Sequence, residues 1–186
     1  MKKLFTVVFL LCMVAMMSAQ QSPPKPAANA GEVLDRQLSN LEKEFVSAAE
    51  AMPADKYDFA PTSGEFKGVR TFGEQVKHVA STNNGISAAL LGDKMPFDYG
   101  KGDNGPENLK TKDQIIQYLK DSFAKAHQAV VTLNNSNVVE QIDGPFGGKS
   151  ARLGAATAFL WHSFDHYGQM VEYLRMNSII PPASRQ

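Results

Sequence analysis

Four long segments with helical periodicity limit what this chain can fold into more than any other feature of its sequence. Apolar residues recur every three or four positions in each segment, and no segment alternates convincingly with period two. The predicted helices cover about residues 31–52, 71–91, 111–133 and 150–178. Each carries one apolar stripe that has to be buried against a neighbour, which predicts an all-α fold, an antiparallel four-helix bundle.

Local signals mark where these helices begin and end. Thr71 with Glu74, and Thr111 with Gln114, have the spacing of capping boxes, in which two side chains satisfy free backbone N–H groups reciprocally. Pro53 ends the first predicted helix. The connection between the second and third helices is long and rich in glycine, as is typical of a functional loop or a crossover.

The beginning of the chain has the pattern of a secretory signal peptide over residues 1–19. Two lysines precede an apolar run that is shorter than the about 20 residues needed to span a membrane, and Ser18 and Ala19 follow it. We expect cleavage after Ala19 and an exported protein, either periplasmic or secreted. The remainder divides into a flexible linker at 20–30, the bundle at 31–180 and a C-terminal tail at 181–186.

Composition excludes several classes of function. The one cysteine, Cys12, lies in the predicted signal peptide, so the mature protein would have neither a disulfide nor a thiolate ligand. The chain has 19 basic and 19 acidic residues without a basic cluster, which argues against nucleic acid and against a membrane partner after cleavage. Bundles of this kind often pair through a helix face, so a homodimer is an open alternative.

A pair of histidines in the last predicted helix is the strongest chemical signal. His162 and His166 are four residues apart, so their imidazoles project from one helix face. They lie at the edge of the predicted main packing stripe, which consists of Leu153, Ala156, Leu160, Phe164, Tyr167, Val171 and Leu174. His78 borders the stripe of the second predicted helix. If the two helices are neighbours, three neutral imidazoles meet, as in catalytic zinc sites that keep one position open.

Less specific interpretations of the same residues stay open. Histidines at this spacing also occur by chance, and Ser163 stands where the zinc-protease motif has a glutamate that acts as base. Glu74, Gln169 and Tyr173 are candidates to orient a ligand or bind substrate, although Glu74 also serves its capping box and Gln169 suits a plain hydrogen bond between helices. His127 has no partner at useful spacing, which favours a packing or surface position.

Three segments resemble the DinB-like family. Residues 162–169 (HSFDHYGQ) and their continuation are similar to the family's closing helix, and residues 71–80 (TFGEQVKHVA) to its second helix with a single ligand histidine. Residues 52–57 resemble the turn after its first helix. The resemblance implies up-down-down-up connectivity. It also implies a divalent metal ion, most often zinc or nickel, on His78, His162 and His166.

The resemblance leaves the reaction open. Some relatives transfer low-molecular-weight thiols or isomerise substrates with them, but such thiols are cytosolic and the predicted export weakens that assignment. The leading hypothesis is an exported metal-dependent enzyme, of transferase or hydrolase type, in which the ion activates water, a thiol or the substrate. The alternatives are a non-enzymatic module that binds a metal or small ligand, favoured by the lack of an assured general base, and a plain bundle without metal.

Overall fold

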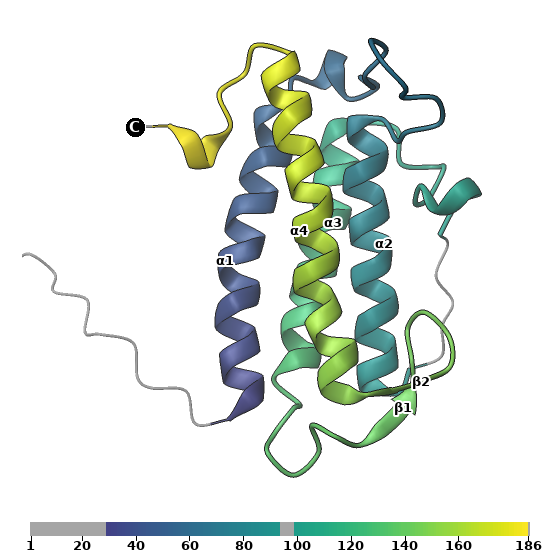
Figure 1. The fold of residues 1–186 in the computed structure, drawn as a ribbon, viewed down its shortest axis with the longest axis vertical. Coiled ribbons are helices and arrows are strands. Elements are labelled where there is room, and N and C mark those ends of the chain that lie inside the picture. The colour runs from purple at the N-terminus through teal and green to yellow at the C-terminus, as the bar shows by residue number, and fades with distance from the viewer. Residues whose placement is uncertain (1–28, 94–98, 186) are drawn as a thin grey trace, which may run out of the picture.

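The computed structural model describes residues 29–93 and 99–185, and within them four long helices form the molecule (Figure 1). They are α1 (Ala30–Ala51), α2 (Phe72–Leu91), α3 (Lys112–Val130) and α4 (Arg152–Met176). The all-α bundle expected from periodicity is therefore confirmed. None of the described helices has the length and apolar character to cross a membrane. The predicted signal peptide, and the linker as far as residue 28, lie outside the described residues.

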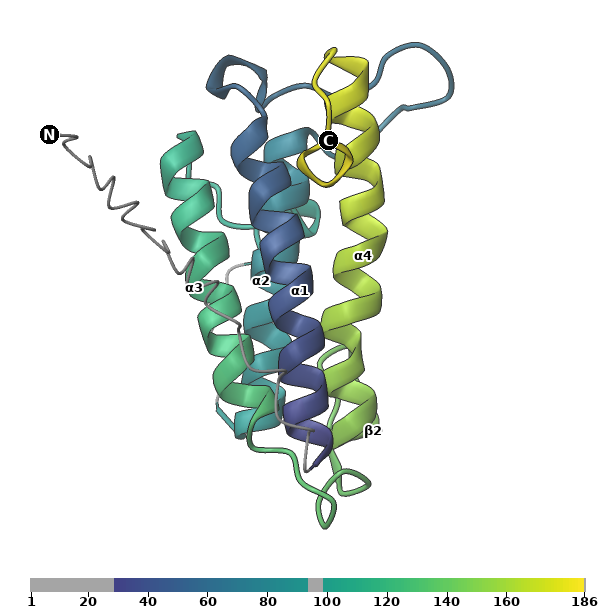
Figure 2. The ribbon, with the colours of Figure 1, turned by 90° about the vertical axis from the view of Figure 1, so that its left-hand side faces the viewer.

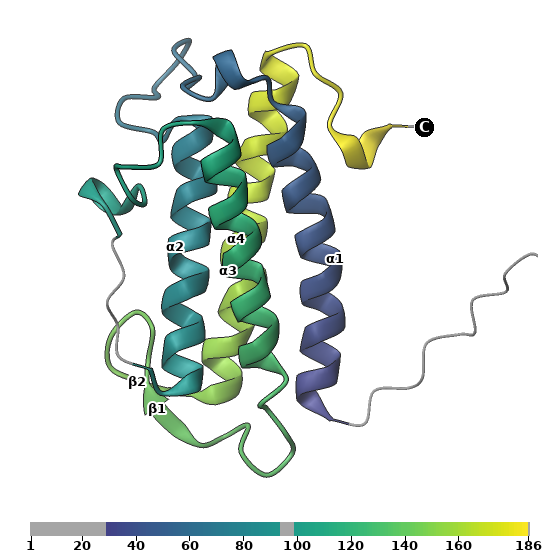
Figure 3. The same cartoon turned by 180° about the vertical axis from the view of Figure 1, so that it is seen from behind.

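The helices follow the up-down-down-up order that the family resemblance implies. Helix α1 runs in one direction, α2 and α3 run in the other, and α4 returns parallel to α1 (Figures 1 and 3). Each of α1 and α2 packs against both α3 and α4, and Figure 2 gives the same arrangement from the side. Consecutive helices α1 and α2 are thus diagonal in the bundle. The helix that carries His78 lies beside the helix that carries His162 and His166.

Both predicted capping boxes are present. At the start of α2, the Thr71 backbone N–H donates to Oε2 of Glu74 at 2.8 Å, and the Glu74 N–H donates back to the Thr71 hydroxyl at 3.3 Å. Thr111 and Gln114 repeat the pattern at the start of α3. Gly92 ends α2 in the left-handed conformation, with φ of 73°, which glycine adopts without a steric penalty. These contacts fix the position of the first turns of α2, where His78 lies.

A short hairpin between α3 and α4 was not predicted. Strands β1 (Gln141–Asp143) and β2 (Lys149–Ala151) pair antiparallel. Strands of three residues are too short to produce a visible alternation of apolar and polar side chains, which is why periodicity did not indicate them. Helix α4 has no side-chain cap. Instead, the N–H groups of Arg152 and Leu153 donate to backbone carbonyls just before β1, at 2.9 Å each, so the hairpin segment caps α4.

The face of α4 that packs against the core differs from the packing stripe predicted for this helix. Leu153 and Phe164, both assigned to that stripe, are 36% and 48% exposed. Three alanines on the buried face allow α4 to approach its neighbours closely, and His166 is tolerated there because it is hydrogen-bonded. His166 therefore lies on the buried face itself, whereas His162 is half-buried and lies at the edge of that face, as predicted. The buried residues of α4 are Ala155, Ala156, Ala158, Phe159, Ser163, His166, Met170, Tyr173 and Leu174.

His127 on α3 is half-buried and joins α3 to α1 by ion pairs, in agreement with the packing or surface position predicted for it. Its Nδ1 lies 2.6 Å from Oδ1 of Asp35, and its Nε2 lies 3.1 Å from Oε2 of Glu42. Both carboxylates come from α1, about two turns apart. Burial acts to lower the pKa of His127, but the hydrogen bonds and charges of the two carboxylates outweigh it, and the pKa is raised above its ordinary value.

We expect these ion pairs to make a pH-dependent contribution to stability. Because the pKa is raised in the folded state, the contribution is complete below the unfolded pKa of about 6.5 and is lost as pH rises through the folded pKa. His127→Gln should lower the free energy of unfolding by about 0.5–1 kcal/mol at acidic pH and by less at alkaline pH. Urea unfolding at pH 6 and pH 9 measures this difference, and an equal loss at both values would contradict it.

Candidate metal centre

The structure brings together the three histidines that the sequence singled out. His78 comes from α2, while His162 and His166 are one turn apart on α4. One ring nitrogen of each lies within 4.8 Å of those of the other two, and the Nε2 atoms of His78 and His162 are 3.1 Å apart. For comparison, two nitrogens bonded at about 2.1 Å to a tetrahedral ion are roughly 3.4 Å apart. The cluster therefore has the dimensions of a metal site.

Hydrogen bonds fix which nitrogen two of these rings present to the cluster. Nδ1 of His78 lies 2.5 Å from the backbone oxygen of Asp103, and Nδ1 of His166 lies 2.5 Å from Oε1 of Gln75. Both oxygens can only accept, so each Nδ1 carries the proton and donates it. The lone pair of each ring is consequently on Nε2. Hydrogen-bond acceptors of this kind orient histidine ligands and fix their tautomer in metal sites.

No oxygen acceptor among the described residues fixes the tautomer of the third ring, His162. Nδ1 of His162 is buried and has no hydrogen-bond partner among the described residues. Its Nε2 faces Nε2 of His78, which already holds a lone pair. The two nitrogens repel each other unless a proton or a cation lies between them. Three imidazole nitrogens are a donor set that suits divalent transition-metal ions, so the residues present fit a metal ion.

The three imidazoles are neutral at pH 7. Burial lowers the pKa of His166 to about 3, and the neighbouring His162 and His78 act in the same direction. Burial likewise lowers the pKa of His162 to about 4, and His78 is shifted downward by the same cause. The positive charge of Arg70 contributes to all three shifts. Unprotonated nitrogens are the form that binds metals, so no proton has to leave the three rings when an ion binds at pH 7.

Gln75 is a residue of the site that sequence reasoning missed. It is buried in α2, and while its Oε1 accepts from His166, its Nε2 donates to Oε1 of Gln169 at 2.8 Å. Gln169 in turn donates to Oδ2 of Asp165 at 3.1 Å. The predicted candidate Gln169 thus reaches the cluster only through Gln75. The position of Gln75, three residues before His78 on one helix face, was a signal that could have identified it.

The other two candidates are held in contacts away from the ring nitrogens. The Glu74 carboxylate completes the capping box with Thr71, and its Oε1 accepts from Nδ2 of Asn104 at 3.0 Å. The Tyr173 hydroxyl donates to the backbone oxygen of Arg70 at 3.1 Å. Both side chains therefore position the segments that surround His78, and neither is hydrogen-bonded to a histidine of the cluster.

A glycine allows the loop before α3 to approach His78. Gly105 has φ of 77°, and a Cβ added to it would lie 2.5 Å from Cβ of Lys77. The loop therefore packs directly on the backbone of α2, one residue before His78. This close approach brings the Asp103 carbonyl to Nδ1 of His78. Only glycine combines this conformation with this lack of space.

We expect Gln75→Leu to weaken metal binding by about 10–100-fold, the usual cost of removing the hydrogen-bond partner of a ligand. The substitution leaves Nδ1 of His166 buried without an acceptor, so the ring loses its fixed orientation. Competition titration with a chromogenic chelator measures the affinity. Gln117→Leu, at an exposed position of α3, is the matched control and should bind as the unchanged protein does. Equal affinity of the two variants would contradict the proposed role of Gln75.

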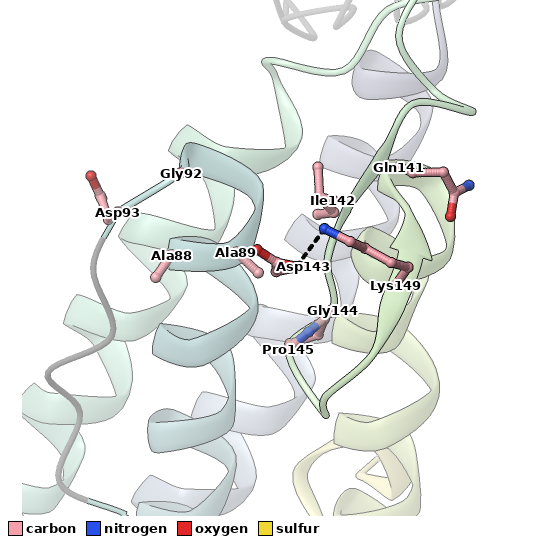
Figure 4. Close-up of a pocket in the computed structure, with 10 residues that line it drawn as sticks. All are labelled: Ala88, Ala89, Gly92, Asp93, Gln141, Ile142, Asp143, Gly144, Pro145 and Lys149. Atoms are coloured by element: carbon pink, nitrogen blue, oxygen red, sulfur yellow. Dashed lines mark hydrogen bonds and ion pairs between the residues drawn. The ribbon is translucent and has the colours of Figure 1, made fainter.

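A cleft of about 470 Å³ lies at the other end of α2, between that end and the hairpin (Figure 4). Its charged lining residues are Asp93, Asp143 and Lys149, and the last two form an ion pair of 2.6 Å. No histidine lines it. Ala88 in its wall is roughly 15 Å along the helix from His78. This cleft is therefore separate from the histidine cluster.

Comparison with known proteins gives the family. A family model described as the DinB superfamily matches residues 37–170, a span that contains all three histidines. This chain belongs to the DinB superfamily. The resemblance found in the sequence is thereby confirmed. A search of curated proteins found no match to this DinB-superfamily protein.

Two solved structures share the DinB-superfamily fold. A DinB-like protein from Bacillus cereus ATCC 10987 is 15% identical, with a TM-score of 0.61, and the match covers 81% of this chain and 95% of that one. YfiT from Bacillus subtilis is also 15% identical, with a TM-score of 0.58 and coverage of 84% and 94%. YfiT is described as a probable metal-dependent hydrolase with an unusual four-helix bundle topology. At this identity the likeness concerns the fold.

Proposed function

We propose that this protein binds one divalent metal ion through Nε2 of His78, His162 and His166, and that it is a metal-dependent enzyme of hydrolase or transferase type. The observation that carries the proposal is the convergence of three neutral imidazoles, two of them oriented by hydrogen bonds at Nδ1. The description of YfiT as a probable metal-dependent hydrolase supports it. Zinc and nickel are the ions we propose, since imidazole suits both.

The ligand set determines what such a site can do. Three neutral side chains contribute no negative charge, so they leave the charge of the ion uncompensated. When bound, a divalent ion supplies Lewis-acid polarisation of a substrate or lowers the pKa of a water or thiol. Gln75 holds His166, and the Asp103 carbonyl holds His78, so neither ring has to reorient during a reaction. Three protein ligands also leave room for a substrate beside the histidines.

A non-enzymatic module that binds a metal or small ligand is the second candidate. It is favoured by the state of Glu74, the one carboxylate among the site candidates named from the sequence. Both oxygens of that carboxylate accept hydrogen bonds, one from the backbone of Thr71 and one from Asn104. A carboxylate held in this way is poorly placed to take a proton from a substrate. Metal binding without turnover would favour this second candidate.

The first experiment is elemental analysis of protein purified without a histidine tag. We expect about one equivalent of metal per chain after loading with zinc or nickel, and an increased melting temperature that a chelator reverses, because the ligands link α2 to α4. Loaded protein is then assayed with hydrolytic and thiol-transfer substrates. Protein that takes up no metal would refute the proposal, whereas bound metal without any turnover would refute only its enzymatic part.

We also propose that residues 1–19 direct export. The basic start, the apolar run and the small residues at its end support this. Fractionation of cells that produce the full chain, with mass measurement of the mature N-terminus, tests it. A protein that keeps Met1 and stays in the cytoplasm would contradict export and would restore cytosolic thiols as candidate substrates.

A further inference from the structure

Arg70 lies beside the histidine cluster and has hydrogen-bonding capacity left over. It immediately precedes the capping residue of α2, and its Nη2 donates to the carbonyl of Gly102 at 3.3 Å. The next residue of that loop, Asp103, accepts from His78. Nε of Arg70 is buried and has no partner among the described residues. The ion pairs found between described residues do not include Arg70.

The position of this cation is unfavourable for a metal site taken alone. The guanidinium of Arg70 and the ring of His78 are hydrogen-bonded to consecutive carbonyls of one loop, so the charge of Arg70 lies near the nitrogens that would bind the ion. A positive charge at that place repels a metal ion. An anion bound beside Arg70 and the metal ion would offset the repulsion between these two cations. It would also give the buried Nε–H of Arg70 an acceptor. The unpaired arginine therefore indicates a negatively charged ligand.

An aromatic surface lies on the other side of the cluster. Phe146, in the turn between β1 and β2, has its ring centroid 6.4 Å from that of His162 and 5.8 Å from that of Trp161. Phe146 is 60% exposed and Trp161 is 57% exposed. Arg70 directly precedes the N-cap of α2, and α2 begins at the end of the bundle opposite the hairpin (Figure 1). The histidines thus have a cation on one side and exposed aromatic rings on the other.

We propose that the metal centre takes a small substrate with two parts, an oxyanion group bound by Arg70 and an apolar group that packs on Phe146 and Trp161. This inference rests on the proposed function. The guanidinium can donate two parallel hydrogen bonds to a carboxylate, phosphate or phosphonate, which fixes the orientation of the anion beside the histidines. The aromatic pair contributes apolar area without selecting for charge. Arg70 is therefore the specificity-determining residue.

The fluorescence of Trp161, the one tryptophan in the chain, provides a direct readout. Metal-loaded protein is titrated with phenylphosphonate, benzoate and uncharged benzyl alcohol. We expect both anions to bind more tightly than the alcohol. Arg70→Gln should weaken anion binding by about tenfold or more and leave the alcohol unchanged. Arg70→Lys, which keeps the charge but not the bidentate geometry, should retain part of the preference. Arg175→Gln, at a surface ion pair with Glu172, is the control.

A second variant tests the aromatic side. Phe146→Ala should weaken all three probes by a similar factor, because it removes apolar contact and no charge. The metal content of every variant is measured first. Wild-type protein that holds its metal but prefers no anion, or an Arg70→Gln variant that binds anions as tightly as wild type, would overturn this inference and leave the proposed function intact. Wild-type protein that binds no metal would overturn both.

Discussion

Replacing His162 by alanine should reduce the metal content from about one equivalent per chain to a small fraction of it. The substitution removes one of the three ligands, so that only His78 and His166 remain to hold an ion. Because loss of a partner that merely orients a ligand costs about 10–100-fold in affinity, loss of a ligand itself should cost more than about 100-fold. Elemental analysis after dialysis against excess free metal and gel filtration measures the result.

His127→Ala is the matched control for this experiment. It also removes a helical imidazole, here from the last turn of α3, but that ring is bonded to Asp35 and Glu42 and belongs to a different pair of helices. The control should keep its full metal content even though it loses some stability. A His162→Ala variant that retains one equivalent of metal, or a control that loses it, would mean that the cluster is not the metal site.

Two of the three histidines, His162 and His166, could be paired from the sequence because their signal is local. The spacing of His162 and His166 depends only on helix geometry, which any strongly periodic segment specifies. The neighbourhood of His78 depends on which helices are adjacent, and only the family resemblance supplied that. The capping boxes of α2 and α3 were predictable for the same local reason, because both members of each box lie within four residues.

The features that sequence reasoning missed depend on contacts between distant parts of the chain. Gln75 and His166 are far apart in sequence, so the hydrogen bond that makes a buried imidazole acceptable was invisible. Because this hydrogen bond could not be predicted, the hydrophobicity of the side chains alone placed Phe164 in the core and the histidines at its edge. Arg70 was missed for a related reason. Its charge becomes meaningful only when the loop at Gly102 and the first turn of α2 are known to meet at the cluster.

Helix α2 also contains polar residues whose burial cannot be predicted from the sequence pattern. Its central residues include the buried polar side chains Ser81, Asn83 and Ser87, which a polarity pattern assigns to a solvent face. Two of them have partners on α3, since Ser81 bonds to the Tyr118 hydroxyl at 3.0 Å and Asn83 donates to the Ser122 hydroxyl at 3.4 Å. Polar residues paired across parallel helices α2 and α3 can be buried at little cost. The adjacency created by the up-down-down-up order decides their environment.

The orientation of α4 leads to the prediction with the largest effect on stability. Phe159 is 1% exposed and Phe164 is 48% exposed, although the periodicity of the sequence placed Phe164 in the packing stripe. Phe159→Ala should therefore lower the free energy of unfolding by about 3–5 kcal/mol, from lost burial and from the cavity that remains. For a domain whose total stability is about 5–15 kcal/mol, this loss leaves a marginal fold. Phe164→Ala should cost less than about 1 kcal/mol.

The two substitutions are matched in chemistry, in helix and nearly in position, so their difference isolates burial. Urea unfolding should be measured with a chelator present, because Phe159 lies one turn before His162 and a bound metal would add its own stabilisation. Equal slopes against urea concentration would establish that only stability has changed. If Phe164→Ala proved the more costly, α4 would have to be rotated toward the face predicted from hydrophobicity. The histidines would then move out of the core, and the convergence of their nitrogens on one cation would be lost with them.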